Sequence, residues 1–300
     1  MSDARRVAVI TGTTHGIGRV TARELARAGL TVAMLCRDPR AASAVRDEIA
    51  ARVPGSDLRI VECDLSSFAS VRRAAAAVRG QFERVDLLVN NAGITSATRR
   101  RSADGFELTF ATNHLGPFLL TTLLIGGIAP GGRVVTVASR AHLRASFDLE
   151  AARDGGRRYR ALAAYDRSKL ANVMHTFALA RRLAGRPVTA NCLHPGVVAT
   201  NLLPAWLRAV KPLFTPVTFD AERGARSTLY AALSPDLDGR SGLYLDENQR
   251  TSAASADAND VTLQEALWDA SERWTGERLE ISPSPVEKKE AAGSPNLRGQ

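Results

Sequence analysis

The chain of 300 residues carries 40 Lys and Arg against 31 Asp and Glu, which gives a formal net charge of +9. Its hydrophobic share of 45% and charged share of 24% are those of a folded globular protein and argue against a largely disordered chain. The basic residues are spread along the sequence, and no aromatic residues alternate with them as a base-stacking surface would require. We therefore expect an Arg-rich solvated surface and no nucleic-acid partner.

Short β-branched runs alternate with longer helical patterns over the first two-thirds of the chain. Continuously apolar runs of this kind are typical of buried parallel strands. Strands are predicted at residues 7–11, 31–36, 58–63, 85–89, 133–138 and 188–193, and helices at 17–28, 41–53, 67–79, 106–125 and 164–183. The alternation predicts an α/β fold, a Rossmann-type doubly wound parallel β-sheet flanked by helices.

The remaining third is less regular. Residues 197–220 are apolar but contain several prolines, which suggests a lid over a ligand or, alternatively, ordinary core. A helix at 221–233, a strand at 242–245 and a helix at 261–274 are predicted to follow. Pro, Ser, Glu and Lys dominate residues 281–300, which predicts a disordered tail after a single domain at residues 1–280.

The first predicted strand ends in a glycine-rich turn, and a helix begins at once. Glycines at such a bend let the backbone approach a pyrophosphate, whose charge the free amides at the helix N-terminus stabilise. The residues of the turn with candidate contacts are Gly12, Thr14, His15, Gly16, Ile17 and Gly18. The glycines follow the pattern G-x-x-x-G-x-G rather than G-x-G-x-x-G. A tight turn also uses glycine for steric reasons alone, so this turn by itself leaves a structural role open.

The glycine spacing resembles that of the short-chain dehydrogenase/reductase superfamily, in its shorter single-domain branch. The resemblance implies hydride transfer between a nicotinamide cofactor and a carbonyl or alcohol carbon. Further motifs that resemble the family occur in the family's order between residues 7 and 200.

The end of the second strand bears on the choice of cofactor. A carboxylate at this place would bind the adenosine ribose of NAD and repel a 2′-phosphate. This chain has Cys36 there, followed by Arg37, whose guanidinium suits a phosphate, and His15 is a further candidate contact. We therefore expect NADP(H), with NAD(H) as the alternative if Arg37 is a plain surface residue and Asp38 takes the place of the acid.

Two motifs follow strands at the sheet edge where this fold binds ligands. Asp64 and Leu65 come after the third strand, and the resemblance implies that they contact the adenine, although an Asp there can equally cap the next helix. Asn91, Ala92 and Gly93 follow the fourth strand and resemble the family's motif beside the cofactor. The alternative is a plain turn of Asn and Gly.

Tyr165 and Lys169 are four residues apart in a predicted helix, so phenol and ammonium lie on one helical face. A nearby cation favours the phenolate and is expected to lower the tyrosine pKa from its usual value of about 10. The pair can then act as a general acid and base, as the resemblance implies. The same spacing also occurs by chance on exposed helices.

Three further candidates complete the predicted site. The Ser139 hydroxyl, at the end of the fifth strand, can hydrogen-bond a reacting oxygen or simply cap a turn. The resemblance implies that Asn113 holds a water that links Lys169 to solvent, whereas a buried Asn can also satisfy an irregular helix. The resemblance also implies a nicotinamide-binding motif made by Pro195, Gly196, Val198 and Thr200.

Residues 112–121, the insertion between Ser139 and Tyr165, and residues 164–183 resemble the retinol dehydrogenase-like group, which includes oxidoreductases fused to WW domains. We expect an oxidoreductase with Asn113, Ser139, Tyr165 and Lys169 as catalytic residues, a small apolar carbonyl or alcohol as substrate, and a homo-oligomeric state, dimer or tetramer. Two rivals are a non-catalytic NADP-binding sensor on the same fold and a Rossmann-type methyltransferase, which needs no Tyr-Lys pair.

The sequence also bears on the compartment. The three cysteines are odd in number and each closes an apolar run, which predicts reduced core residues and neither a disulfide framework nor a metal site. They are Cys36, Cys63 and Cys192. The polar N-terminus runs directly into a strand pattern, and the apolar stretch at residues 115–129 is interrupted by Pro117. We expect a cytoplasmic protein with no membrane partner.

Overall fold

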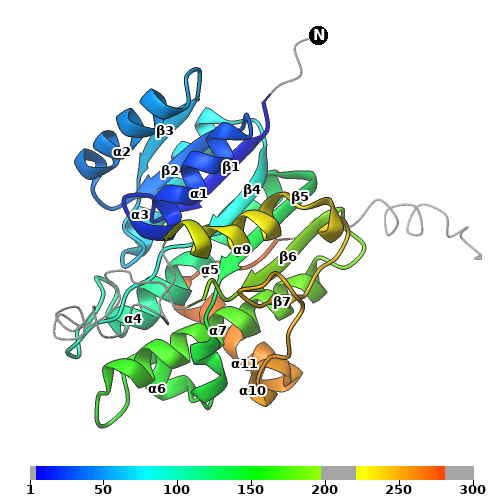
Figure 1. Ribbon diagram of the computed structural model, residues 1–300. Coiled ribbons are helices and arrows are strands. Elements are labelled where there is room, and N and C mark those ends of the chain that lie inside the picture. The colour runs from blue at the N-terminus through cyan, green and yellow to red at the C-terminus, as the bar shows by residue number, and fades with distance from the viewer. Residues whose placement is uncertain (1–4, 197–220, 281–300) are drawn as a thin grey trace, which may run out of the picture.

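A seven-stranded sheet forms the centre of the protein, as the computed structural model of residues 5–196 and 221–280 shows (Figure 1). Its order is β3-β2-β1-β4-β5-β6-β7, and all neighbouring strands are parallel. The strands are β1 (Val7–Thr11), β2 (Thr31–Cys36), β3 (Leu58–Glu62), β4 (Val85–Asn90), β5 (Ile128–Val137), β6 (Val188–Leu193) and β7 (Tyr244–Leu245). The predicted single-domain, doubly wound α/β fold is confirmed.

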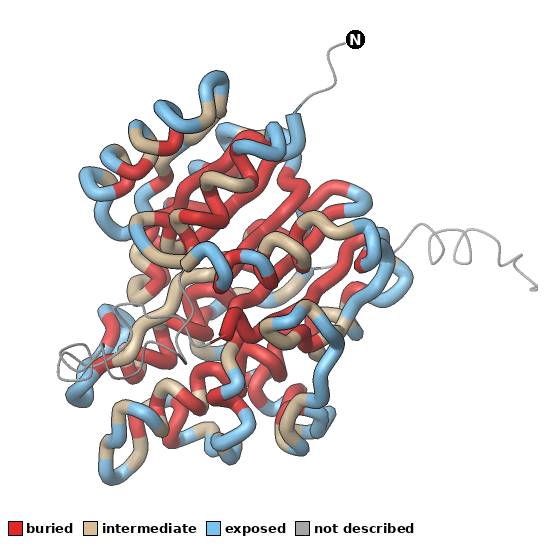
Figure 2. The backbone as a smooth tube through the Cα atoms, viewed as in Figure 1, coloured by how far each residue is buried: buried red, intermediate tan, exposed pale blue. Residues whose placement is uncertain are grey.

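Helices cover both faces of the sheet. The strands β1, β2 and β4 are therefore buried at every position, which agrees with their continuously apolar sequences. One face is covered by α1 (Gly16–Arg27), α2 (Pro39–Arg52) and α9 (Ala221–Leu233), and the other by α3 (Phe68–Gln81), α5 (Gly116–Leu124) and α7 (Ala161–Arg182). In β1, Ala8 and Ile10 belong to the first of these cores and Val9 to the second. Figure 2 shows the buried residues gathered along the strands and the inner sides of the helices.

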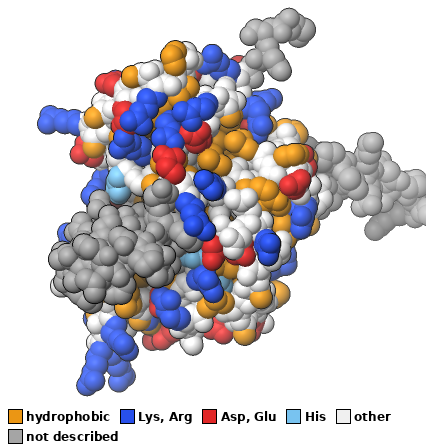
Figure 3. All heavy atoms as spheres, in the orientation of Figure 1, with side chains coloured by type: hydrophobic (Ala, Val, Ile, Leu, Met, Phe, Trp, Pro, Cys, Tyr) orange, Lys and Arg blue, Asp and Glu red, His pale blue; other side chains and the backbone are white. Residues whose placement is uncertain are grey.

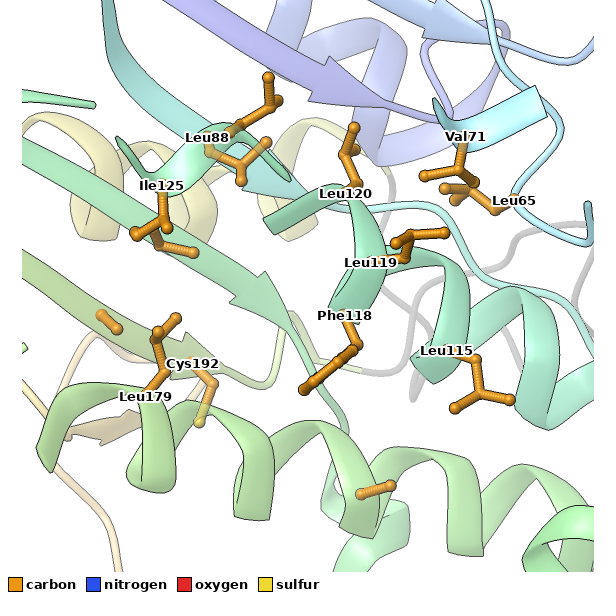
Figure 4. Packing of buried hydrophobic residues seen from close by; sticks show 14 of the residues in the cluster. Leu65, Val71, Leu88, Leu115, Phe118, Leu119, Leu120, Ile125, Leu179 and Cys192 are labelled. Carbon is orange, nitrogen blue, oxygen red and sulfur yellow. The ribbon is translucent and has the colours of Figure 1, made fainter. Parts of the chain in front are cut away.

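Two C-terminal helices form an outer layer on α7. They are α10 (Ala256–Asn259) and α11 (Val261–Thr275), and α11 inserts Trp268 edge-on against Phe118 of α5 at 5.1 Å between ring centroids. Figure 4 shows Phe118 among the buried residues of α5 that fill this side of the core. Residues 108–127 are the one helical segment in the described chain that is long and apolar enough to cross a membrane, but 83% of it is buried in the protein, as in a core helix.

The helix predicted at residues 106–125 is divided. A single turn, α4 (Leu108–Phe110), leads into a π-helical turn at Ala111–Leu115, and α5 follows. Pro117 lacks an amide hydrogen, so it cannot donate to the carbonyl four residues earlier, that of Asn113. A π-helical turn at this point absorbs the irregularity and is often found at functional sites.

Other differences from the prediction are local. The strand β5 begins at Ile128, earlier than predicted, because Ile128 pairs with Val85 before an irregularity in the β4–β5 register, after which pairing resumes at Arg133. The short helix α6 (Leu149–Asp154) was not predicted; Asp148 caps it. The three cysteines are free and buried. The predicted lid at 197–220 and tail at 281–300 lie outside the described residues.

The order of the strands reverses between β1 and β4. The strands β1 and β4 are neighbours although β2 and β3 separate them in the chain, so the winding direction reverses between them. Ligands in open α/β sheets bind at the carboxyl ends of the strands beside such a reversal. On the viewed face, Lys and Arg side chains are scattered over several elements and do not form one continuous stripe (Figure 3).

Candidate active site

The glycine-rich turn lies between β1 and α1, at the reversal of the sheet. Gly12 and Gly16 have positive φ angles of 73° and 57°, which disfavour a side chain. At Gly18 a Cβ atom would lie 2.1 Å from the carbonyl oxygen of Gly12 and 2.4 Å from Nδ2 of Asn91. Gly18 thus packs directly against the turn, which leaves a backbone cradle at the helix N-terminus of the kind that accepts a pyrophosphate.

The motif after β4 holds this turn in shape. The side-chain amide of Asn91 donates to the carbonyl of Thr11 at 2.8 Å, and the backbone amides of Asn91 and Ala92 both donate to the Thr11 hydroxyl at 3.0 Å. A plain turn does not account for these contacts across the sheet. Thr11 was not predicted as a site residue; its position beside the motif glycine is the only sequence signal for this role.

The two residues after β2 are Arg37, which is exposed, and Asp38, whose carboxylate binds the start of α2. Arg37 is exposed and forms no ion pair within residues 5–196 and 221–280. Asp38 caps α2, accepting the amides of Arg40 and Ala41 at 2.9 and 3.1 Å. One carboxylate oxygen of Asp38, Oδ1, is therefore engaged by the helix. His15 is also exposed, with its Nδ1 2.9 Å from the Thr14 hydroxyl.

Asp64 has the local contacts of a turn. Its carboxylate accepts the amide and the hydroxyl of Ser66 at 2.9 and 2.7 Å, while Ser67 provides the cap of α3. These contacts satisfy one carboxylate oxygen, and the capping alternative applies to the turn and not to α3 itself. Leu65 is buried, and its carbonyl oxygen packs closely against Gly116, where an added Cβ atom would lie only 2.3 Å from it.

Tyr165 and Lys169 lie together on α7. The Nζ atom of Lys169 is 5.7 Å from the centre of the Tyr165 ring and donates a hydrogen bond of 2.8 Å to the carbonyl of Val137 at the end of β5. Lys169 is only 3% exposed. This burial lowers the pKa of its ammonium to about 8, because the charged form loses water.

Contrary to the prediction, the pKa of Tyr165 is not lowered in the protein without a cofactor. Burial raises the pKa of Tyr165, while its hydrogen bond with Ser139 and the charge of Arg144 act in the opposite direction. Lys169 does not offset this effect of burial: its ammonium is itself buried, donates to the Val137 carbonyl and lies 5.7 Å from the centre of the tyrosine ring. A lowered pKa therefore needs a further positive charge.

Asn113 lies in the π-helical turn and bridges the loop after β4 to α7. Its Oδ1 accepts the amide of Ile94 at 2.8 Å, and its Nδ2 donates to the carbonyl of Ile94 at 3.0 Å and the hydroxyl of Ser168 at 2.9 Å. A Cβ at Gly93 would lie 3.4 Å from Lys169 Nζ and 3.6 Å from Asn113 Oδ1. Asn113 and Lys169 thus flank the same backbone, and the side-chain bonds of Asn113 go to the loop after β4 and to α7, not to the backbone of the irregular helix. The sequence did not predict a role for Ser168.

Ser139 follows β5 and both caps a turn and faces the tyrosine. Its hydroxyl accepts the amide of Ala141 at 3.2 Å at the start of the 3-10 turn Arg140–Arg144. Because the hydroxyl oxygen is the acceptor in that bond, its own hydrogen remains available for donation. The two alternatives for Ser139 are therefore compatible.

The nicotinamide motif lies only partly within the described residues. Pro195 and Gly196 follow β6 and are buried, and Gly196 has a φ angle of 84°. Val198 and Thr200 lie outside the described residues.

Comparison with known proteins identifies relatives over most of the chain. Residues 6–210 match the model of the short chain dehydrogenase family. The chain is 39% identical over 293 residues to retinol dehydrogenase 14 of Mus musculus, covering 90% of this chain and 86% of that protein.

Solved structures agree. An uncharacterized protein from Mycobacterium paratuberculosis is 38% identical, with a TM-score of 0.77 and coverage of 93% of this chain and 96% of that one. A blue fluorescent protein from a metagenomic library, solved in complex with NADPH, is 29% identical, with a TM-score of 0.65 and coverage of 80% and 95%.

Proposed function

Because the chain belongs to the short-chain dehydrogenase family, in its retinol dehydrogenase-like group, we propose that it transfers a hydride between NADP(H) and the carbonyl or alcohol carbon of a small apolar substrate. The observation that carries the proposal is the grouping of a buried ammonium, a phenol and a serine hydroxyl at the carboxyl end of β5. The residues are Lys169, Tyr165 and Ser139.

The residues at the reversal of the sheet fit a dinucleotide. Gly12 and Gly16 have positive φ angles, a side chain at Gly12 or Gly18 would clash with the turn or with the motif after β4, and Asn91 fixes the shape of the turn. The exposed Arg37 at the end of β2 supports a 2′-phosphate, since a guanidinium binds phosphate with paired donors. Bound NADPH would supply the hydride.

The protein's own groups handle the proton and the oxygen. In reduction, the Ser139 hydroxyl donates a hydrogen bond to the substrate carbonyl oxygen, and Tyr165 transfers its phenolic proton to that oxygen as the hydride reaches the carbon. The products are an alcohol, the oxidised cofactor and a tyrosinate, which the Lys169 ammonium together with the positive nicotinamide ring would stabilise before solvent returns the proton. Oxidation is the reverse.

Exposed leucines support an apolar substrate. Leu162, three residues before Tyr165, is 65% exposed, and Leu143, four residues after Ser139, is 48% exposed. These are two of the three large hydrophobic residues that the described chain exposes. The apolar composition of residues 197–220 supports a lid over the same substrate.

The proposal also keeps a cytoplasmic location and a homo-oligomer, to be measured by cell fractionation and light scattering. If α7 forms the interface between subunits, the helices α10 and α11 packed on it leave only part of its surface available for that contact.

The test is an absorbance screen at the reduced-nicotinamide band with apolar aldehydes and ketones, run separately with NADPH and NADH. We expect turnover with NADPH and a lower kcat/KM with NADH. Tight NADPH binding without turnover of any substrate would favour the alternative, a non-catalytic NADP-binding sensor. Preference for NADH would overturn the cofactor assignment alone.

A further inference from the structure

His142 is a buried titratable residue next to the site that the proposed reaction does not use. It lies in the turn Arg140–Arg144 that follows Ser139, and its side chain is 0% exposed. Its imidazole packs edge-on against Tyr244 of β7, with 4.7 Å between ring centroids. Most polar groups at this depth have hydrogen-bond partners, and both ring nitrogens of His142 have one.

The partners define the protonation of the ring. Nδ1 is 2.7 Å from the carbonyl oxygen of Ser139, and Nε2 is 3.4 Å from the backbone amide of Ser255, which caps α10. A carbonyl can only accept and an amide can only donate, so Nδ1 carries the hydrogen and Nε2 accepts. The ring is thus neutral, and burial lowers the pKa of His142, which favours the same form.

Ser139 is fixed mainly by this residue. Its carbonyl accepts two hydrogen bonds from His142, one from the backbone amide at 3.2 Å and one from Nδ1 at 2.7 Å. The amide of Ala141 binds the Ser139 hydroxyl oxygen. With these three bonds the peptide plane of Ser139 and the direction of its hydroxyl are set together.

We propose that His142 is a positioning residue for the hydride-transfer reaction: its neutral imidazole holds the main chain of Ser139 so that the hydroxyl stays directed at the substrate oxygen beside Tyr165. The inference rests on the proposed function. It predicts that His142 acts only through Ser139, whereas a residue that merely fills space against Tyr244 would affect folding and not the role of that serine.

The test is a double-mutant cycle with His142→Phe and Ser139→Ala. Phenylalanine keeps a ring against Tyr244 but loses both hydrogen bonds. We expect His142→Phe to lower kcat about tenfold, with the KM of the substrate and the Kd of NADPH within about twofold of wild type. In the Ser139→Ala background the same substitution is expected to change kcat less than about twofold, because coupled residues are not additive.

A conservative pair of variants supplies the second measurement, and it also decides the question if His142→Phe does not fold. His142→Asn places an amide near the position of Nδ1, where it can donate to the Ser139 carbonyl, whereas His142→Gln places its amide near Nε2. We expect Asn to restore kcat to within about threefold of wild type and Gln to restore less.

Additive losses in the cycle, or equal activities of the Asn and Gln variants, would overturn the positioning role. A wild-type protein that turns over no carbonyl would instead contradict the proposed function, so the two failures are distinguishable. Near-ultraviolet circular dichroism of each variant identifies any that are misfolded.

Discussion

The ammonium of Lys169 lies 5.7 Å from the centre of the Tyr165 ring and bonds to the Val137 carbonyl, so helix α7 and the end of β5 meet at a buried positive charge. This arrangement keeps a cation beside the phenol, but burying the ammonium costs free energy of desolvation. We therefore expect Lys169 to support activity and to lower the stability of the fold at neutral pH.

Replacement of Tyr165 by Phe removes the proposed proton donor but keeps the ring. General acid catalysis of this kind contributes about 10²- to 10⁴-fold, so kcat is expected to fall by that factor while NADPH binding, followed by fluorescence titration, is retained. Tyr230→Phe on α9 is the matched control, since within the described residues its hydroxyl bonds only to Asp236, at 3.3 Å, and it should keep full turnover. Equal activity of the two variants would remove Tyr165 from the mechanism.

Replacement of Lys169 by Met is expected to lose activity and gain stability at pH 7. The pKa of Lys169 is about 8 in the folded protein against 10.5 for the free side chain, so between these values the unfolded chain binds more protons and wild-type stability rises with pH. The variant should therefore exceed wild type in free energy of unfolding at pH 7, with a difference that shrinks by pH 9.5. Urea denaturation at both pH values measures this; a difference independent of pH would contradict the buried charge.

Gly18→Ala should abolish cofactor binding. Its Cβ would lie 2.1 Å from the Gly12 carbonyl oxygen, so the glycine turn must change shape. Gly80→Ala, at a helix position where no atom lies within 4 Å of the added Cβ, is the control and should bind NADPH like wild type. Calorimetric titration of both variants gives the comparison, and unchanged affinity in Gly18→Ala would show that the turn is not the cofactor cradle.

Arg37→Ser should change cofactor preference. If the guanidinium binds the 2′-phosphate, kcat/KM with NADPH falls by roughly ten- to a hundredfold, since a charge-assisted hydrogen bond contributes about 1.5–3 kcal/mol. Activity with NADH should change little. Arg52→Ser, at the far end of α2, should alter neither value, and a parallel loss with both cofactors in Arg37→Ser would contradict a phosphate contact.

His175→Phe should make the protein less sensitive to acid. Burial lowers the pKa of His175 to about 3, with the charge of Arg182 acting in the same direction, against 6.5 in the free side chain. The folded state therefore resists protonation, and stability is lost as pH falls from 6.5 toward 3, by up to about 1.4 kcal/mol per pH unit from this residue. Denaturation midpoints at pH 7.5 and 5 should differ less in the variant than in wild type; equal differences would show that His175 is not a source of acid sensitivity.

The sequence by itself determined the elements and the candidate residues. Apolar runs and helical periodicity are local properties, so the strands and the main helices were predictable, and the motifs placed Tyr165 and Lys169 on one helix. The family resemblance followed from those same residues and is confirmed by the comparisons.

Only the tertiary structure decided which contacts these residues make. The π-helical turn at Asn113, the contact of His142 with Ser255 and the outer layer of α11 on α7 all join residues that are distant in the chain or depend on packing. The raised pKa of Tyr165 and the lowered pKa of Lys169 have the same origin. Burial and hydrogen-bond partners depend on which residues surround a side chain in space, and a local sequence pattern does not specify those neighbours.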